Sequence, residues 1–258
     1  MNSHGFAVPQ GAIKRANDRR FDALRPLSFD TNVLKHAEGA CLVAFGNTKV
    51  ICTASVEDRV PPFLKGKKEG WVTAEYGMLP RATSTRCDRE AAKGRQAGRT
   101  QEIQRLIGRA LRAVCDMKAL GERQIKIDCD VLEADGGTRT AAITGSYVAL
   151  FNACVNLMKK KCVNRFPIID QVAAVSCGLL GGYALLDLDF SEDSNAAVDA
   201  NFVFTKSGLL VETQACAEKK AFSEEQFLSL LQLAKKGTKI LFQEQKKAVT
   251  NSSYLSNM

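Results

Sequence analysis

Apolar and polar residues alternate over several stretches of this chain, and a period of two predicts β-strands. The clearest stretch is QIKIDCDVL, whose apolar residues fall on one side and whose polar residues fall on the other, as in a half-buried strand. The run VLKHAEGACLVAFGNTKVICTASVED predicts an antiparallel meander, with turns at Gly39 and at Gly46-Asn47. The remaining strand-like runs are WVTAEYGML, VAAVSCGLL, YALLDLDF and ANFVFT.

A period of three to four residues predicts three helices. The first covers residues 98–114, the second residues 140–160 and the third, an amphipathic helix, residues 223–249. The strands occur in runs and do not alternate strictly with helices. This order favours an α+β fold in which mixed β-sheets are covered by helices.

The pattern also divides the chain along its length. Residues 1–24 are polar and basic, and we expect them to be poorly ordered because apolar alternation begins only at Leu27. We assign residues 1–14 to a disordered N-terminal extension, 15–250 to a single domain and 251–258 to a C-terminal tail, since no second linker interrupts the pattern. For the extension, a plain tail is favoured over a weak organelle-targeting segment because it is short.

Composition narrows the class of protein. A chain of 258 residues with 45% hydrophobic and 25% charged residues is long and balanced enough to bury a large core. It has no run of about 18 uninterrupted apolar residues and no secretory signal, so we expect a cytoplasmic protein without membrane contact. Nine singly spaced cysteines favour reduced thiols over disulfides or a zinc cluster. With only His4 and His36 available, mechanisms that need paired histidines or a serine–histidine pair are disfavoured.

The net charge of +8 is concentrated in one region. Residues 81–112 hold nine basic and three acidic side chains, so this region carries +6 and the rest of the chain +2. Arginine grips phosphate through its planar guanidinium fork, and such a focus of arginine predicts a polyanionic partner such as RNA. The alternative is a solvated helix face, which more often mixes lysine with glutamate.

Two of the predicted helices begin with the same residue types. The sequences Gly-Arg-Thr at 98–100 and Gly-Thr-Arg at 137–139 both stand where the free N–H groups of a helix N-terminus attract anions. Either tripeptide alone is a common helix start, because threonine caps helices and glycine makes turns. Two of them directed at one point would bind a free phosphate ion.

The segment DLDFSEDSNAAVDANF concentrates acidic residues between two strand-like runs. A hairpin there would bring Asp193 and Asp199 to the same end of a sheet, where they would suit Mg²⁺, which takes one or two carboxylates plus water and substrate phosphate. Asp187, Asp189 and Glu192 compete for this role, and a solvated acidic turn remains the alternative.

Taken together, these features favour phosphorolysis over hydrolysis. Metal-free hydrolysis of RNA needs a general base to activate water or a 2′-hydroxyl, and histidine is scarce here. Inorganic phosphate arrives as an anion, so positioning and charge neutralisation can supply most of the catalysis.

Longer stretches of the chain resemble a known family. The segments GWVTAEYGMLPRAT, DREAAKGRQAGRTQEIQRLIGRALRAV, LGERQIKIDCDVLEADGGTRTAAITG and EDSNAAVD closely resemble bacterial ribonuclease PH, and the similarity extends from about Arg15 to Ala248. The resemblance implies the ribonuclease PH fold, in a protomer of a homohexameric ring built as a trimer of dimers. It also implies phosphate-dependent 3′→5′ trimming of RNA, above all of transfer RNA 3′ ends, with release of nucleoside diphosphates.

The resemblance further implies roles for individual residues. Inorganic phosphate, the co-substrate, would be bound by Arg99, Gly137, Thr138 and Arg139, with Arg99 also counted as catalytic. The RNA strand would be bound by Arg81, Arg86 and Arg89. The metal ion, Mg²⁺ or alternatively Mn²⁺, and the general-acid role would fall to Asp193 and Asp199.

The chain departs from the family pattern in places, and two rival functions remain. Arg19-Arg20, Ala200 and the stretch 213–216 differ from the usual residues, and we expect none of these departures to touch the phosphate or metal groups. One rival is a non-catalytic ring subunit that only binds RNA, as exosome-like relatives do. The other is a metal-dependent hydrolase, which would release monophosphates in place of diphosphates.

Overall fold

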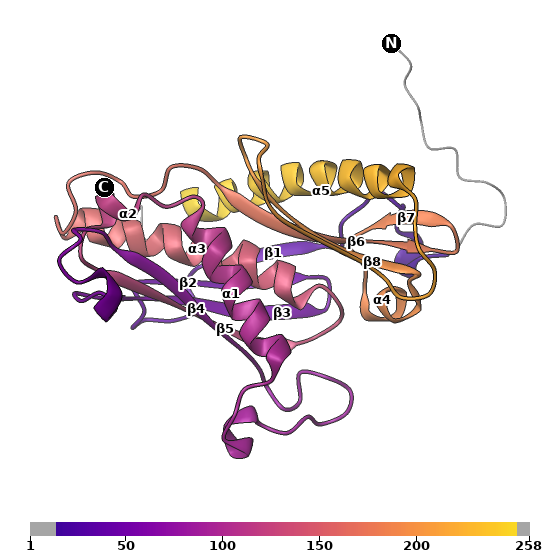
Figure 1. The fold of residues 1–258 in the computed structure, drawn as a ribbon, viewed down its shortest axis with the longest axis horizontal. Helices are drawn as coiled ribbons and strands as arrows, with labels where there is room; N and C mark the ends of the chain where they lie inside the picture. The colour runs from indigo at the N-terminus through magenta and orange to yellow at the C-terminus, as the bar shows by residue number, and fades with distance from the viewer. Residues whose placement is uncertain (1–13, 252–258) are drawn as a thin grey trace, which may run out of the picture.

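The computed structural model describes residues 14–251, and over this range two β-sheets pack against three long helices (Figure 1). The first sheet has the strand order β1-β2-β3-β5-β4 and the second β7-β6-β8-β9. The strands are β1 (Leu27–Asp30), β2 (Gly39–Phe45), β3 (Thr48–Glu57), β4 (Trp71–Met78), β5 (Gln124–Glu133), β6 (Val172–Leu180), β7 (Tyr183–Leu186), β8 (Val198–Thr205) and β9 (Leu210–Ala217). The helices are α1 (Gly98–Arg112), α2 (Met117–Leu120), α3 (Thr138–Lys159), α4 (Phe190–Asn195) and α5 (Glu224–Thr250), with short 3₁₀ turns at Ala16–Asp18, Pro62–Leu64 and Glu90–Lys93.

Most neighbouring strands are antiparallel, and β4 with β5 is the parallel pair. A parallel pair requires a crossover connection. Here the crossover carries α1, which packs on β4. The N-terminus of α1 therefore lies at the end of the sheet where β4 stops, at Met78.

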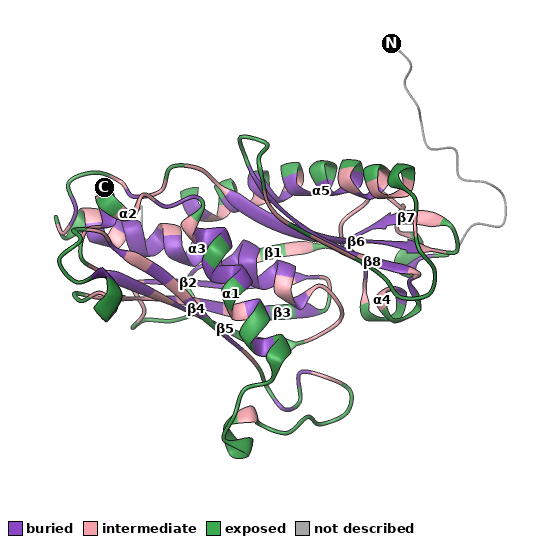
Figure 2. Cartoon of the chain, viewed as in Figure 1, coloured by how far each residue is buried: buried purple, intermediate pink, exposed green. Residues whose placement is uncertain are grey.

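Helix α3 is the central helix of the fold and contacts both sheets. It packs on β2 and β3 of the first sheet and on β6 of the second, and Figure 2 shows it almost entirely buried. It is long and apolar enough to cross a membrane by length and composition, but 83% of that window is buried inside the protein, as in a core helix. Helix α5 lies against β6 and β7, and its Gln245 amide donates to the carbonyls of Thr144 and Val172, both at 2.9 Å.

The predicted periods are confirmed for the long elements. The strand predicted from QIKIDCDVL is β5, with its alternate apolar residues buried, and the three predicted helices are α1, α3 and α5. Gly46 makes the predicted β2–β3 turn with a φ of 58°. Gly39 does not make a turn. It begins β2, where an added Cβ would collide with the carbonyl of Ala149, so its glycine serves the close approach of β2 to α3.

The expectation that residues 1–24 are poorly ordered is wrong for the part that the structure describes. Arg15 is 3% exposed and its guanidinium pairs with Glu192 at 2.6 Å, which fixes the segment to α4. A polar sequence can be ordered when its charges are paired inside the protein. The predicted extension up to residue 13 and the tail from residue 252 lie outside the described residues.

Candidate active site

The two anion-attracting helix starts exist in the structure. Helix α1 begins after Ala97 and α3 after Gly137, and neither of these residues provides a side-chain hydrogen bond to the first N–H groups of its helix. By contrast, Asp189 and Ser223 cap α4 and α5 with complete capping boxes. The first N–H groups of α1 and α3 are therefore available to bind an anion.

Two successive glycines shape the start of α3. Gly136 and Gly137 both adopt the left-handed conformation, with φ of 75° and 65°. Successive N–H groups in such turns form concave anion-binding nests. An added Cβ at Gly136 would lie 2.6 Å from the carbonyl oxygen of Leu188, so this turn packs directly on the residues that lead into α4.

Thr138 and Arg139 are held from neighbouring elements. The Tyr76 hydroxyl on β4 donates to Thr138 Oγ1 at 2.9 Å. The Arg139 guanidinium donates to Gln214 Oε1 on β9 at 2.8 Å and lies 3.6 Å from the Glu102 carboxylate on α1. The Arg139 side chain is 13% exposed, so it is fixed at the edge of the site.

Gln214 connects β9 to the start of α3. It lies in the stretch 213–216, where Ala215 replaces the glycine of the family pattern, and its side chain bonds directly to Arg139. Cys216 in the same stretch is paired across the sheet with Asp199. Strand β9 therefore forms one wall of the site.

Asp193 and Asp199 come from different elements. Asp193 lies on α4 and Asp199 near the start of β8. The predicted hairpin between strand-like runs is wrong, because β7 and β8 lie on opposite sides of β6 and the connection contains a helix. The aspartates are still neighbours, since Asp193 is one of the groups that raise the pKa of Asp199.

The electrostatics place both aspartates beside the two arginines. Burial, followed by the charge of Asp193, raises the pKa of Asp199 to about 6. Burial also raises the pKa of Asp193. The charges of Arg99 and Arg139 oppose this rise in the pKa of both carboxyl groups. Burial also raises the pKa of Tyr76, and the same two arginines oppose that rise. The charges of Arg99 and Arg139 thus reach both carboxyl groups.

The three competing acids are engaged elsewhere. Asp187 is fully buried against Arg25 at 2.7 Å, and Glu192 is held by Arg15 at 2.6 Å and Arg19 at 2.9 Å. Asp189 accepts the backbone N–H of Glu192 in the α4 capping box. These ion pairs and this hydrogen bond compensate the negative charges of the three carboxylates. Asp193 and Asp199, by contrast, have no ion pair at 4.0 Å or less with any residue in the range 14–251.

The acid pair fits a magnesium ion with few protein ligands. Within residues 14–251 no three His, Cys, Asp or Glu side chains gather as a metal cluster. Mg²⁺ is bound in phosphoryl-transfer sites by one or two carboxylates together with substrate phosphate. Two half-buried carboxyl groups with raised pKa values suit a cation, because a cation between them favours the charged forms.

Within residues 14–251, the three loop arginines make no hydrogen bond or ion pair with this cluster. Arg81, Arg86 and Arg89 lie in the segment between β4 and α1, which projects from the body of the molecule (Figure 1). Arg81 donates to the carbonyl of Ser84 at 3.0 Å, and Arg86 pairs with Asp88 at 3.4 Å. These contacts stay within the loop, and the Thr100 hydroxyl ties its far end to α1 through Glu90 at 2.7 Å.

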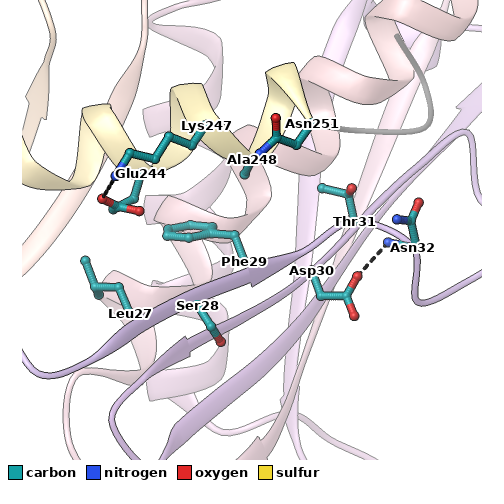
Figure 3. Close-up of a pocket in the computed structure, with 10 residues that line it drawn as sticks. All are labelled: Leu27, Ser28, Phe29, Asp30, Thr31, Asn32, Glu244, Lys247, Ala248 and Asn251. Atoms are coloured by element: carbon teal, nitrogen blue, oxygen red, sulfur yellow. Dashed lines mark hydrogen bonds and ion pairs between the residues drawn. The ribbon is translucent and has the colours of Figure 1, made fainter. Parts of the chain in front are cut away.

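A separate groove lies between β1 and α5 (Figure 3). It has a volume of about 410 Å³ and is lined by residues such as Phe29, Asp30 and Lys247. None of the candidate site residues lines it, so it is not part of the active site.

Comparison with known proteins decides the family. The chain matches the model of the 3′ exoribonuclease family, domain 1, over residues 23–156 and that of domain 2 over residues 170–237. It is 57% identical over 237 residues to the ribonuclease PH of Rhodospirillum rubrum, and the alignment covers 92% of this chain and 99% of that protein. The chain belongs to the 3′ exoribonuclease family. Its two sheets fall in different domain models, since β1 to β5 lie within the first match and β6 to β9 within the second.

Solved structures share the ribonuclease PH fold of this 3′ exoribonuclease. The Archaeoglobus fulgidus exosome with RNA bound to the active site matches with a TM-score of 0.76 at 21% identity, covering 90% of this chain and 92% of that one. Rice (Oryza sativa) Rrp46 matches with a TM-score of 0.73 at 19% identity, covering 91% of this chain and all of that one. At these identities the likeness concerns the fold.

Three residues at this exoribonuclease site could not be predicted from the sequence. Tyr76 resembles an ordinary strand residue, and Gln214 lies in a stretch without a clear pattern. Arg25 follows directly on the segment that the sequence predicts to be poorly ordered. No local signal marks them, because their contacts to Thr138, Arg139 and Gly136 span 62, 75 and 111 residues of sequence.

Proposed function

We propose that this protein is a phosphate-dependent 3′→5′ exoribonuclease that shortens RNA by phosphorolysis. The observation that carries the proposal is the cluster of Arg99, Arg139, Asp193 and Asp199, in which each arginine lowers the pKa of both carboxyl groups. A phosphate site and an acid pair from distant parts of the sequence would thus serve one reaction.

Inorganic phosphate would bind between the starts of α1 and α3. The N–H groups around Gly137 and Thr138 would donate to its oxygens, and Arg99 and Arg139 would add charge-assisted hydrogen bonds worth roughly 1.5 to 3 kcal/mol each. Tyr76 keeps the Thr138 hydroxyl oriented, because its own proton is already donated to that oxygen. The hydroxyl proton of Thr138 then remains free for the phosphate.

In the reaction, a phosphate oxygen attacks the phosphorus of the 3′-terminal phosphodiester. The bond from that phosphorus to the 3′-oxygen of the preceding nucleotide breaks, so the products are a nucleoside diphosphate and an RNA one residue shorter. The departing 3′-oxygen takes a proton from the carboxylic acid of Asp193 or Asp199, and the proton that the attacking phosphate loses restores it. A pKa of about 6 at Asp199 suits a group that donates a proton near neutral pH.

Asp193 and Asp199 are also the residues that would hold Mg²⁺ or Mn²⁺. The ion would neutralise charge on the scissile phosphate. One of the two carboxyl groups would then hold the ion while the other transfers the proton.

The RNA strand would approach over the loop between β4 and α1. Arg81, Arg86 and Arg89 are exposed on this loop, and arginine is suited to contact backbone phosphates. We further propose transfer RNA 3′ ends as the substrate, a homohexameric ring built as a trimer of dimers as the assembly, and the cytoplasm as the location. The 57% identity to a ribonuclease PH supports these assignments.

Product analysis tests the proposal. RNA is incubated with the protein and Mg²⁺, with and without inorganic phosphate, and the released nucleotides are separated by chromatography. We expect nucleoside diphosphates that appear only with phosphate. Monophosphates released without phosphate would indicate a hydrolase, and RNA binding with no release under either condition would indicate a non-catalytic ring subunit.

A further inference from the structure

We infer that Arg25 is a positioning residue that joins the phosphate-binding turn to the acid-bearing loop and fixes the direction of the turn's N–H groups. The inference rests on the proposed function and adds a residue to its machinery. Arg25 is 6% exposed, lies just before β1 and occupies the boundary between the two sheets.

The first half of the connection runs from Arg25 to the turn before α3. Its guanidinium donates to the carbonyl oxygen of Asp135 and, at 3.4 Å, to that of Gly136. Thr48 supports the same turn, because its hydroxyl donates to Gly136 O at 2.7 Å and accepts the N–H of Asp135 at 2.9 Å. Two buried side chains therefore hold two successive carbonyl groups.

The second half of the connection runs from Arg25 to Asp187. The guanidinium donates to both carboxylate oxygens, at 2.7 and 3.1 Å, and the Arg25 backbone N–H donates to one of them at 2.8 Å. Asp187 is fully buried and has a φ of 55°, a conformation that non-glycine residues adopt at some energetic cost. The residues that follow Asp187 lead directly into α4, which carries Asp193.

The turn and the loop also touch one another. The Phe190 N–H at the start of α4 donates to the Asp135 carboxylate at 3.2 Å. Arg25 thus supports a direct contact between the turn before α3 and the loop that leads into α4. Moving the Arg25 guanidinium would change the position of the turn before α3 relative to the loop that leads into α4.

Peptide geometry explains why this matters for phosphate. The carbonyl of one residue and the N–H of the next belong to the same trans peptide unit and point in opposite directions. Because the carbonyls of Asp135 and Gly136 are held toward Arg25, the N–H groups of Gly136 and Gly137 are directed away from it. Arg25 thereby sets the direction of donors that would bind phosphate, without touching phosphate itself.

Arg25→Lys tests the inference, because lysine keeps the charge but cannot make the forked contacts. We expect the KM for inorganic phosphate to rise about tenfold or more, while RNA affinity in the absence of phosphate stays within about twofold. Phosphate binding is also measured by calorimetry, so that the readout does not depend on turnover. A loss of fold alone would not separate these two affinities.

Arg15→Lys is the matched control. Arg15 is equally buried and belongs to the same group of ion pairs, but within the described part of the chain its side chain donates to residues 20, 21, 186, 187 and 192 and not to the turn. We expect its KM for phosphate to stay within about twofold of the wild-type value. Equal rises in the two variants, or an unchanged value in Arg25→Lys, would overturn the inference.

Two variants of Thr48 test the inference even if Arg25→Lys does not fold. Thr48→Val removes the hydroxyl that holds the turn and should weaken phosphate binding, whereas Thr48→Ser keeps it and should not. Equal phosphate affinity in these two variants would also contradict the inference. If the wild-type protein instead releases no diphosphates but binds phosphate through this turn, the proposed reaction fails while the positioning role stands.

Discussion

At the scale of single residues, Asp199 is the group whose ionisation is most clearly tied to the site. Its pKa of about 6 lies above the ordinary value of 3.8, so the folded protein binds this proton more tightly than the unfolded chain does. The contribution of Asp199 to stability is therefore fully present below about pH 4 and is lost as pH rises through 6. At neutral pH, the buried negative charge destabilises the fold.

Asp199→Asn removes that charge. We expect the free energy of unfolding at pH 7.5 without divalent cations to rise by about 1 to 2 kcal/mol, a figure reduced because the group is partly solvent-accessible. The difference from wild type should vanish near pH 4, and diphosphate release should be abolished. Urea unfolding at the two pH values measures this. A variant less stable than wild type at pH 7.5 would contradict the assigned electrostatics.

Arg99 and Arg139 test the phosphate assignment separately from RNA binding. Arg99→Ala or Arg139→Ala should leave the RNA Kd within about twofold while lowering phosphate-dependent kcat/KM by roughly 10- to 100-fold, since each removes one charge-assisted hydrogen bond. Arg105→Ala, on the exposed side of α1, is the control for the removal of a positive charge. Equal decreases in RNA affinity and in trimming would show that these arginines bind RNA and not phosphate.

At the scale of elements, the loop between β4 and α1 carries the candidate RNA-binding arginines. Within the described residues, Arg81 and Arg86 make their hydrogen bonds and ion pairs inside the loop and none with Asp193 or Asp199, so the effect of the loop arginines should be on RNA affinity. Replacing both Arg86 and Arg89 by alanine should weaken RNA binding and reduce the logarithmic salt slope by about 1.4, since each RNA phosphate that a side chain neutralises adds about 0.7. Fluorescence anisotropy over a range of salt concentrations measures it. A slope equal to that of wild type would remove these residues from the interface.

Elements also show what the sequence could and could not predict. The periods of β5, α1 and α3 were readable because each element buries one face, or almost all of its surface, in a single core. Helix α4 was not readable, because six residues with mostly polar side chains carry no period, and its capping box at Asp189 resembles an acidic turn. Strand β9 was missed for a related reason, since as an edge strand it buries neither face fully.

The candidate site was predictable in part for the same physical reason. Glycine, threonine and arginine at a helix start are local signals, and both tripeptides proved to begin helices with free N–H groups. The choice of Asp193 and Asp199 over Asp187 could not follow from composition, because it depends on which carboxylates meet buried arginines from residues 15–25. Those contacts span 162 to 177 residues of sequence.

At the scale of the whole molecule, the candidate active site forms where the two sheets meet. The first sheet and its helices bring the starts of α1 and α3. The second sheet brings Asp199 and Gln214, and α4, which connects two of its strands, brings Asp193. One continuous hydrophobic core joins the sheets through α3, and the ion pairs of Arg15, Arg19 and Arg25 join them at the site. The chemistry thus depends on an arrangement that neither sheet contains alone.

The most direct test of phosphorolysis at this site follows the oxygen atoms of phosphate. RNA is incubated with the protein, Mg²⁺ and fully ¹⁸O-labelled inorganic phosphate, and the released nucleotides are analysed by mass spectrometry. We expect nucleoside diphosphates whose terminal phosphate carries the label, at a rate that falls in Arg139→Ala. Unlabelled monophosphates released at the same rate in wild type and variant would contradict phosphorolysis at this site.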